Sequence, residues 1–77
     1  MNQPARDSTV ATTEFVPDAQ TLEILAALAQ GRNKVETAET CLVSGRTMRR
    51  KLAELRDEWG VDSTVEAVVR AVRRGLI

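Results

Sequence analysis

The chain has 77 residues, enough for one small domain, and its content of 43% hydrophobic and 29% charged residues is typical of a globular protein. It has no histidine and one cysteine, which excludes an internal disulfide, a Cys/His zinc site and histidine-based catalysis. No apolar run reaches the length of about 18 residues that a membrane span requires. We therefore expect no enzymatic activity, no metal and no cofactor, and a cytoplasmic location.

The net charge is zero, but the charges are unevenly distributed along the chain. Residues 1–31 carry a net charge of −3, residues 32–56 a net charge of +4, and residues 57–77 a net charge of −1. The centre of the basic block reads Met-Arg-Arg-Lys at positions 48–51. Physiological salt screens exposed charges beyond about 8 Å, so a polyanion would meet this block without feeling the distant acids. The alternative interpretation is an ordinary solvated helix face.

The first 16 residues differ in pattern from the rest of the chain. Residues 1–16 have no helical or strand period and are rich in threonine, which predicts a flexible N-terminal arm. Residues 17–77 show four helical segments and no alternating strand pattern, which predicts an all-α domain. Phe15 and Val16 are expected to pack onto this domain just before Pro17.

The first two helices are predicted at residues 18–30 and 34–40. Asp18 and Asn33 are suited to be their N-caps, and Glu36 stands at the capping-box spacing from Asn33. Gly31 is expected to end the first helix, because glycine readily adopts the left-handed conformation. The apolar positions are Leu22, Leu25, Ala26, Leu28 and Ala29 in the first helix and Val35, Ala38, Cys41 and Leu42 in the second.

The third and fourth helices follow at about residues 45–58 and 64–76. Ser44 is the predicted N-cap of the third helix, and Gly60 its end. Ser63 and Glu66 form the capping-box pattern that starts the fourth helix. The third helix has one apolar stripe of Met48, Leu52, Leu55 and Trp59, and the fourth an apolar face of Val65, Val68, Val69, Val72 and Leu76.

Residues 33–58 have the layout of a helix-turn-helix unit, with a short support helix, a tight turn and a longer second helix. In such units one stripe of the second helix packs inward and the opposite side enters the DNA major groove. The opposite side here holds Arg46, Arg49, Arg50, Ala53 and Arg56. Arginine can bridge phosphates or bind the O6 and N7 atoms of guanine. The helix N-terminus, with Ser44 and Thr47, can accept a phosphate.

Several short segments match the pattern of one known family. They are Glu23-Ile24-Leu25, Ala29-Gln30-Gly31, Glu36, Ala38, Glu39, Val43-Ser44, Thr47-Met48, Leu55, Trp59-Gly60-Val61, Glu66-Ala67-Val68 and Arg73-Arg74-Gly75-Leu76-Ile77. On these segments the stretch from residue 17 to residue 77 resembles the LuxR/GerE-type helix-turn-helix DNA-binding domain of bacterial transcription regulators. The resemblance implies a four-helix domain whose third helix reads the major groove and whose last helix forms a homodimer.

The charge pattern and the resemblance together give two sets of candidate residues. The expected DNA contacts are Lys34, Ser44, Arg46, Thr47, Arg49, Arg50, Lys51, Ala53 and Arg56. The expected dimer contacts are Val65, Val69, Arg70, Val72 and Arg73. The expected partners are therefore double-stranded DNA and a second copy of the chain, and the location is the bacterial cytoplasm, at the nucleoid when DNA is bound.

The chain departs from the family pattern in the support helix and the turn. Val35 takes a position that is usually polar and Thr37 one that is usually apolar, which predicts a rotated or register-shifted support helix. Cys41 and Leu42 stand where the turn usually has leucine and then glycine. Cys41 is expected to be a small buried apolar residue rather than a redox sensor.

Two further hypotheses belong to other classes. The zero net charge and the acidic first segment favour a protein-interaction module that binds or blocks another regulatory protein through the valines of the last helix. An enzyme would need a catalytic base or metal set that the sequence lacks. The family's regulators usually carry a sensing or receiver domain, so the chain is either a stand-alone regulator or an excised domain, and the start at Met1 favours the first.

Overall fold

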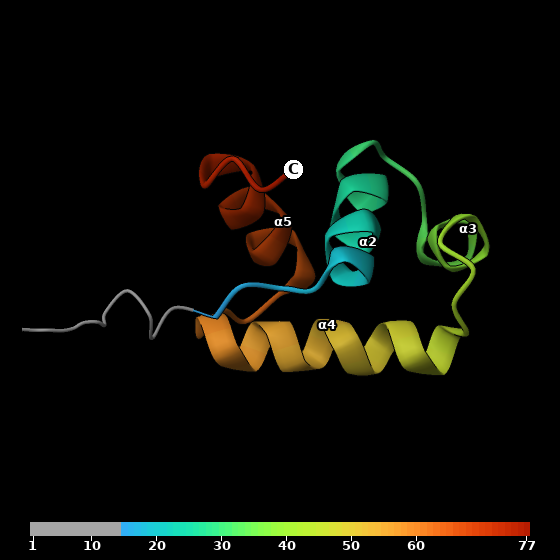
Figure 1. Cartoon of the computed structure of the whole chain (residues 1–77), viewed down its shortest axis with the longest axis horizontal. Coiled ribbons are helices and arrows are strands. Elements are labelled where there is room, and N and C mark those ends of the chain that lie inside the picture. The colour runs from blue at the N-terminus through green and yellow to red at the C-terminus, as the bar shows by residue number, and fades with distance from the viewer. Residues whose placement is uncertain (1–14) are drawn as a thin grey trace, which may run out of the picture.

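The computed structural model describes residues 15–77, which form a small all-α domain (Figure 1). Its four helices are α2 (Ala19–Ala29), α3 (Lys34–Thr40), α4 (Gly45–Trp59) and α5 (Thr64–Arg73), and no strand occurs in this part of the chain. Figure 1 shows α4 running along one side of the domain, with α5, α2 and α3 placed on it in that order. The predicted all-α fold is confirmed. Residues 1–14 of the predicted arm lie outside the described residues.

Each helix is preceded by the N-cap residue that the sequence predicted. The N-cap side chains that accept a hydrogen bond from the backbone N–H three residues further on belong to Asp18, Asn33, Ser44 and Ser63. Asn33 and Glu36 form a complete capping box, since the Glu36 carboxylate accepts from the Asn33 N–H at 3.1 Å. At the start of α5 the Glu66 carboxylate accepts a hydrogen bond at 2.9 Å from the N–H of Asp62, the residue before the N-cap, and not from the N–H of the N-cap Ser63 itself. These caps satisfy backbone donors that a helix leaves unpaired at its start.

The core lies where α2 and α5 meet α4. All of the predicted inward stripe of α4 is buried, and it packs against Ile24 and Leu25 of α2 and Ala67 and Ala71 of α5. The prediction for α2 was partly wrong, because Ile24 and Ala27 are buried whereas Ala29 is exposed. In α5 the two alanines face inward, and their small side chains allow the helix to approach its neighbours closely.

The support helix α3 keeps a polar residue inside and an apolar residue outside. Thr37 is fully buried, whereas Val35 is exposed to solvent. Two of the apolar positions of this segment, Val35 and Leu42, therefore lie outside the core, and the predicted rotation of the support helix was wrong. Among residues 15–77 no group is placed to accept or donate a hydrogen bond at the Thr37 hydroxyl. The capping box at Asn33 fixes where α3 begins.

The turn between α3 and α4, residues 41–44, contains a strained position. Leu42 has a φ angle of +57°, in the left-handed region that L-residues with a side chain avoid. Its side chain is 89% exposed, so burial does not compensate the strain. The backbone N–H of Val43 donates to the carbonyl of Ala38 at 3.0 Å, a bond that closes the end of α3 and holds the turn in this conformation.

The carboxyl end of α4 joins the first described residues to the last helix. The indole N–H of Trp59 donates to the carbonyl of Phe15 at 3.2 Å, so the backbone of Phe15 contacts the domain. Phe15 and Val16 are nevertheless 37% and 66% exposed, so the predicted packing of these two residues onto the domain was wrong for Val16 and holds only at the backbone for Phe15. Arg70 of α5 donates from Nη1 to the carbonyl of Trp59 at 2.7 Å. The guanidinium of Arg74 lies 5.0 Å from the centre of the Trp59 ring. Trp59 is therefore a core residue, as predicted.

Candidate nucleic-acid interface

Two stripes of side chains lie on opposite faces of α4. The buried stripe consists of Met48, Leu52, Leu55 and Trp59. An exposed stripe with the same spacing begins two residues earlier and consists of Arg46, Arg50, Ala53 and Asp57. Because each residue turns an α-helix by about 100°, an offset of two residues places the second stripe about 200° from the first, directed at solvent.

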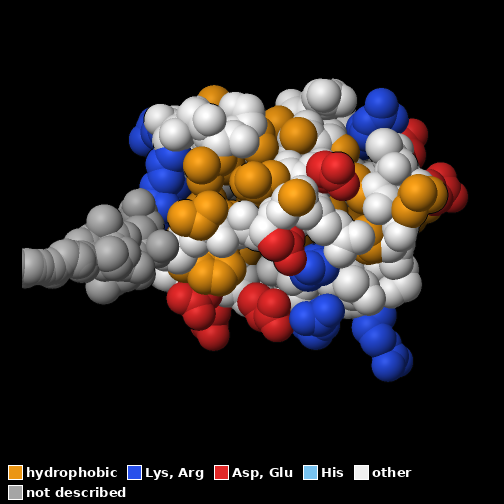
Figure 2. Space-filling model, viewed as in Figure 1, with side chains coloured by type: hydrophobic (Ala, Val, Ile, Leu, Met, Phe, Trp, Pro, Cys, Tyr) orange, Lys and Arg blue, Asp and Glu red, His pale blue; other side chains and the backbone are white. Residues whose placement is uncertain are grey.

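The charge of this exposed side changes sign along α4. Its first half carries Arg46, Arg49 and Arg50, and its second half carries Glu54, Asp57 and Glu58. Figure 2 shows basic side chains beneath the N-terminal part of the helix and acidic side chains beneath its C-terminal part. A polyanion is therefore attracted to the start of the helix and repelled by its end.

Hydroxyl and guanidinium groups surround the N-terminus of α4. Ser44 Oγ accepts a hydrogen bond from the Thr47 N–H and donates one to Thr47 Oγ1, each at 3.0 Å. Arg49 Nη1 lies 3.2 Å from the point that a Cβ on residue 45 would occupy, so Gly45 leaves room for the guanidinium beside the helix. The first N–H groups of a helix have no partner within it, and with an arginine beside them they can bind a phosphate oxygen.

Lys34 extends the basic surface from α4 onto α3. Lys34 is the first residue of α3 and is exposed. It lines a shallow groove between α3 and the first half of α4. The other lining residues are Arg49, the acidic Glu39, Gly45 and the apolar residues Val35, Ala38, Val43 and Met48. We call the exposed cations of this region, Lys34, Arg46, Arg49 and Arg50, the basic face.

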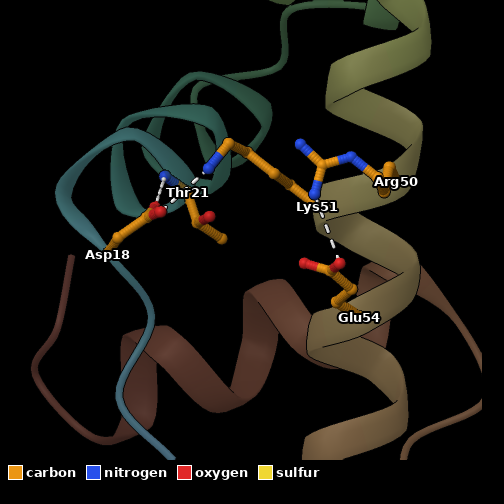
Figure 3. A network of polar contacts seen from close by, with 5 residues as sticks. All are labelled: Asp18, Thr21, Arg50, Lys51 and Glu54. Atoms are coloured by element: carbon orange, nitrogen blue, oxygen red, sulfur yellow. Dashed lines mark hydrogen bonds and ion pairs between the residues drawn. The ribbon is translucent and has the colours of Figure 1, made fainter.

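Two candidate DNA contacts lie away from the basic face. Lys51 points toward the start of α2, where its ammonium donates to Asp18 Oδ2 at 2.8 Å, and only 16% of its side chain is exposed (Figure 3). Arg56 is half-buried and donates from Nη1 to Thr64 Oγ1 at 3.1 Å. The helical spacing predicts that Lys51 and Arg56 lie beside the buried stripe, because each is three or four residues away from two members of that stripe.

The Lys51–Asp18 pair fastens α4 to the N-terminus of α2. The Lys51 ammonium, together with the backbone and hydroxyl of Thr21, holds the pKa of the Asp18 carboxyl well below its usual range. Asp18 therefore serves at once as N-cap of α2 and as anion for Lys51. These bonds give Lys51 a structural partner, Asp18, that the sequence did not indicate.

A different ion pair lies on the exposed side of α4, next to Ala53. Arg50 Nη1 and Glu54 Oε2 are 3.2 Å apart, and the two side chains are 58% and 60% exposed (Figure 3). Glu54 was absent from the predicted site residues. Its position four residues after Arg50 is the sequence signal that could have identified the pair.

The candidate dimer contacts lie on α5, where four of them are exposed and Arg70 is partly buried. Val65, Val69 and Val72 are 72%, 43% and 52% exposed, and we call this stripe the valine face. Arg73 is exposed beside it, and Val61, Glu66 and Arg70 line the same shallow groove along α5. Arg70 is already hydrogen-bonded within the domain, to Trp59.

Other kinds of site find little support in the described residues. Within residues 15–77 no three His, Cys, Asp or Glu side chains lie close enough together to hold a metal ion. Cys41, which was expected to be buried, is only half-buried, and this burial together with the nearby Glu23 carboxylate raises the pKa of its thiol. None of the helices in this part of the chain is both long and apolar enough to cross a membrane.

Comparison of the chain with protein-family models, with curated proteins and with solved structures finds no match. The resemblance to LuxR/GerE-type domains therefore stays a prediction from the sequence. The function has to be inferred from two surfaces, the basic face of α3 and α4 and the valine face of α5.

Proposed function

We propose that this protein is a DNA-binding transcription regulator in which α3 supports α4 and α4 enters the major groove. The observation that carries the proposal is the basic face, which gathers exposed cations at the start of both helices. Duplex DNA carries about one negative charge per 1.7 Å of its axis, so such a surface gains affinity through every phosphate that it neutralises. The family resemblance of residues 17–77 to LuxR/GerE-type domains supports the same function.

The charge order along α4 supports a specific orientation on DNA. The acidic second half is repelled by phosphates, so α4 enters the groove with its N-terminal half first. Helix-turn-helix proteins contact base edges with the N-terminal residues of the recognition helix, which fits this orientation. Ala53 is exposed between Arg50 and Asp57, and its small side chain allows the helix to approach the bases.

The valine face supports a homodimer as the binding unit. Three exposed valines on one side of α5 are an apolar surface that a second copy of α5 would cover. Two recognition helices related by a two-fold axis would meet successive major grooves about 34 Å apart, or about 10 bp between half-site centres. The operator is therefore expected to be a short inverted repeat.

Binding to a fluorescent random-sequence duplex at about 50 and 200 mM salt tests the proposal. The wild-type chain is expected to lose affinity steeply as salt increases. The double variant Arg49→Ala/Arg50→Ala removes two cations of the basic face and should flatten the slope of log affinity against log salt by about 1.8 per bound protomer. Fluorescence anisotropy gives both quantities, and circular dichroism verifies that the variant is folded.

A second cation provides the control for net charge. Arg32 lies in the loop between α2 and α3, outside the basic face, and Arg32→Ala removes the same single charge as Arg50→Ala. Arg50→Ala should weaken binding markedly more than Arg32→Ala, by about 1–3 kcal/mol on a preferred sequence if Arg50 reads a base. Absence of binding by the folded wild-type chain at low salt would contradict the proposal.

The exposed valine face also favours a second candidate, a protein-interaction module that binds or blocks another regulator. In that case α5 is the partner surface and the basic face is an ordinary solvated one. The two functions separate in the same experiment, because the module would show no salt-dependent affinity for DNA.

A further inference from the structure

The ion pair between Arg50 and Glu54 carries an inference that rests on the proposed function. Both side chains are more than half exposed, and the Nη1–Oε2 distance is 3.2 Å (Figure 3). Arg50 belongs to the stripe opposite the core, so its guanidinium is held by Glu54 on the side of α4 that faces solvent. Glu54 therefore acts on a cation of the exposed stripe that the proposed function directs into the groove.

The ion pair with Glu54 leaves several N–H donors of the Arg50 guanidinium available for DNA. A guanidinium has five N–H donors in a planar fork, and Glu54 accepts from Nη1. The remaining donors can bind the O6 and N7 acceptors of a guanine, which is the commonest specific contact of arginine in the major groove. A guanidinium that is already held in one orientation loses less conformational freedom on binding than a free one.

The Glu54 carboxylate also changes which acceptors attract Arg50. It compensates the charge of the guanidinium and begins the acidic half of α4 formed with Asp57 and Glu58. A phosphate carries a full negative charge and is repelled strongly by this carboxylate, whereas the O6 and N7 atoms of guanine carry only partial negative charge and are repelled less. Glu54 thus weakens binding to the DNA backbone more than it weakens binding to a base edge.

We propose that Glu54 is a specificity-determining positioning residue, which orients Arg50 toward a guanine and reduces the affinity of α4 for phosphate. Replacement of Glu54 by glutamine removes the charge and keeps the side-chain shape. The variant should bind random-sequence DNA more tightly, with a salt slope steeper by up to about 0.9 per bound protomer, and should discriminate less between sequences.

Selection from a pool of duplexes with a randomised centre, followed by sequencing, tests the proposal. Wild type, Arg50→Ala, Glu54→Gln and Glu58→Gln are compared at one salt concentration. The position at which Arg50→Ala loses its preference for guanine marks the base that Arg50 reads. A bidentate contact is expected to give a preference for guanine of about tenfold or more. At that position Glu54→Gln should lower this preference by a factor of at least about three. Its other base preferences should remain.

Glu58→Gln is the matched control, because it makes the same charge change one helical turn further along, on an exposed residue. It should keep the guanine preference, and the midpoint of thermal unfolding of Glu54→Gln should stay within about 4 °C of the wild type. An unchanged guanine preference in Glu54→Gln would overturn the inference and leave the proposed function standing. A wild-type chain that binds no duplex at low salt would overturn both.

Discussion

Replacing Thr37 by valine tests whether the interior of this domain holds an uncompensated polar group. Thr37 is fully buried in α3, and its hydroxyl has no hydrogen-bond partner among residues 15–77. Valine has nearly the same shape and the same branching at Cβ, so the helix propensity and the packing of position 37 change little. The substitution therefore isolates the cost of the buried hydroxyl.

The expected gain in the free energy of unfolding is about 1–2 kcal/mol. A buried hydroxyl without a partner costs about 1–3 kcal/mol in desolvation, and valine abolishes this cost. For a domain of this size each kcal/mol shifts the unfolding midpoint by about 4–8 °C, so Thr37→Val should raise the midpoint by about 4–16 °C.

Equilibrium unfolding in urea, followed by circular dichroism and by the fluorescence of Trp59, provides the assay. Trp59 is the only tryptophan of the chain and is buried in the core, so it reports tertiary unfolding. Thr40→Val is the control, because Thr40 ends the same helix with an exposed side chain and its replacement should change stability by less than about 0.5 kcal/mol. If Thr37→Val unfolds at the same or a lower urea concentration than the wild type, the hydroxyl has a partner in solution and the reasoning is wrong.

Two other predictions concern the turn and the start of α2. Leu42→Gly should raise the free energy of unfolding by about 0.5 kcal/mol, because relief of about 1–2 kcal/mol of left-handed strain exceeds the entropy that glycine adds. Leu42→Ala retains the strain, and equal urea midpoints for the two variants would refute this explanation. Asp18→Asn keeps an N-cap but loses the charge that binds Lys51, so it should be less stable than the wild type at pH 7 by up to about 1 kcal/mol. Because the pKa of Asp18 lies below its ordinary 3.8 in the folded state, the charge stabilises the fold above about pH 4 and this advantage declines at lower pH. Urea unfolding at several pH values checks this, and a stability difference that did not shrink between about pH 4 and pH 2 would contradict it.

Features set by residues within one helical turn could be predicted from the sequence. The N-caps at Asp18, Asn33, Ser44 and Ser63 depend only on a polar side chain and the backbone three residues away. Gly60 ends α4 with a φ angle of +66°, as the local pattern indicated. The inward stripe of α4 and the exposed position of Arg50 follow from the helical period alone.

Features set by tertiary packing could not be predicted in the same way. In α5 an alanine pair and a valine stripe lie on different sides, and the close approach of neighbouring helices selects Ala67 and Ala71 for the core. In α3 hydrophobicity favours burial of Val35, but the orientation of the helix buries Thr37 instead. In the sequence Lys51 is one more cation of a basic run. Its ion pair with Asp18 could not be predicted, because the two residues are far apart in sequence.

The order of charges on α4 opposes the helix macrodipole. The N-terminal end of a helix carries a partial positive charge and its C-terminal end a partial negative one, so arginines at the start and acids toward the end each cost about 0.3–1 kcal/mol. The first turn of α4 holds no acidic residue, and Arg46 stands where aspartate or glutamate would stabilise the helix. Laboratory evolution for heat resistance alone would therefore favour an acid at position 46 and would weaken the basic face of a more stable domain.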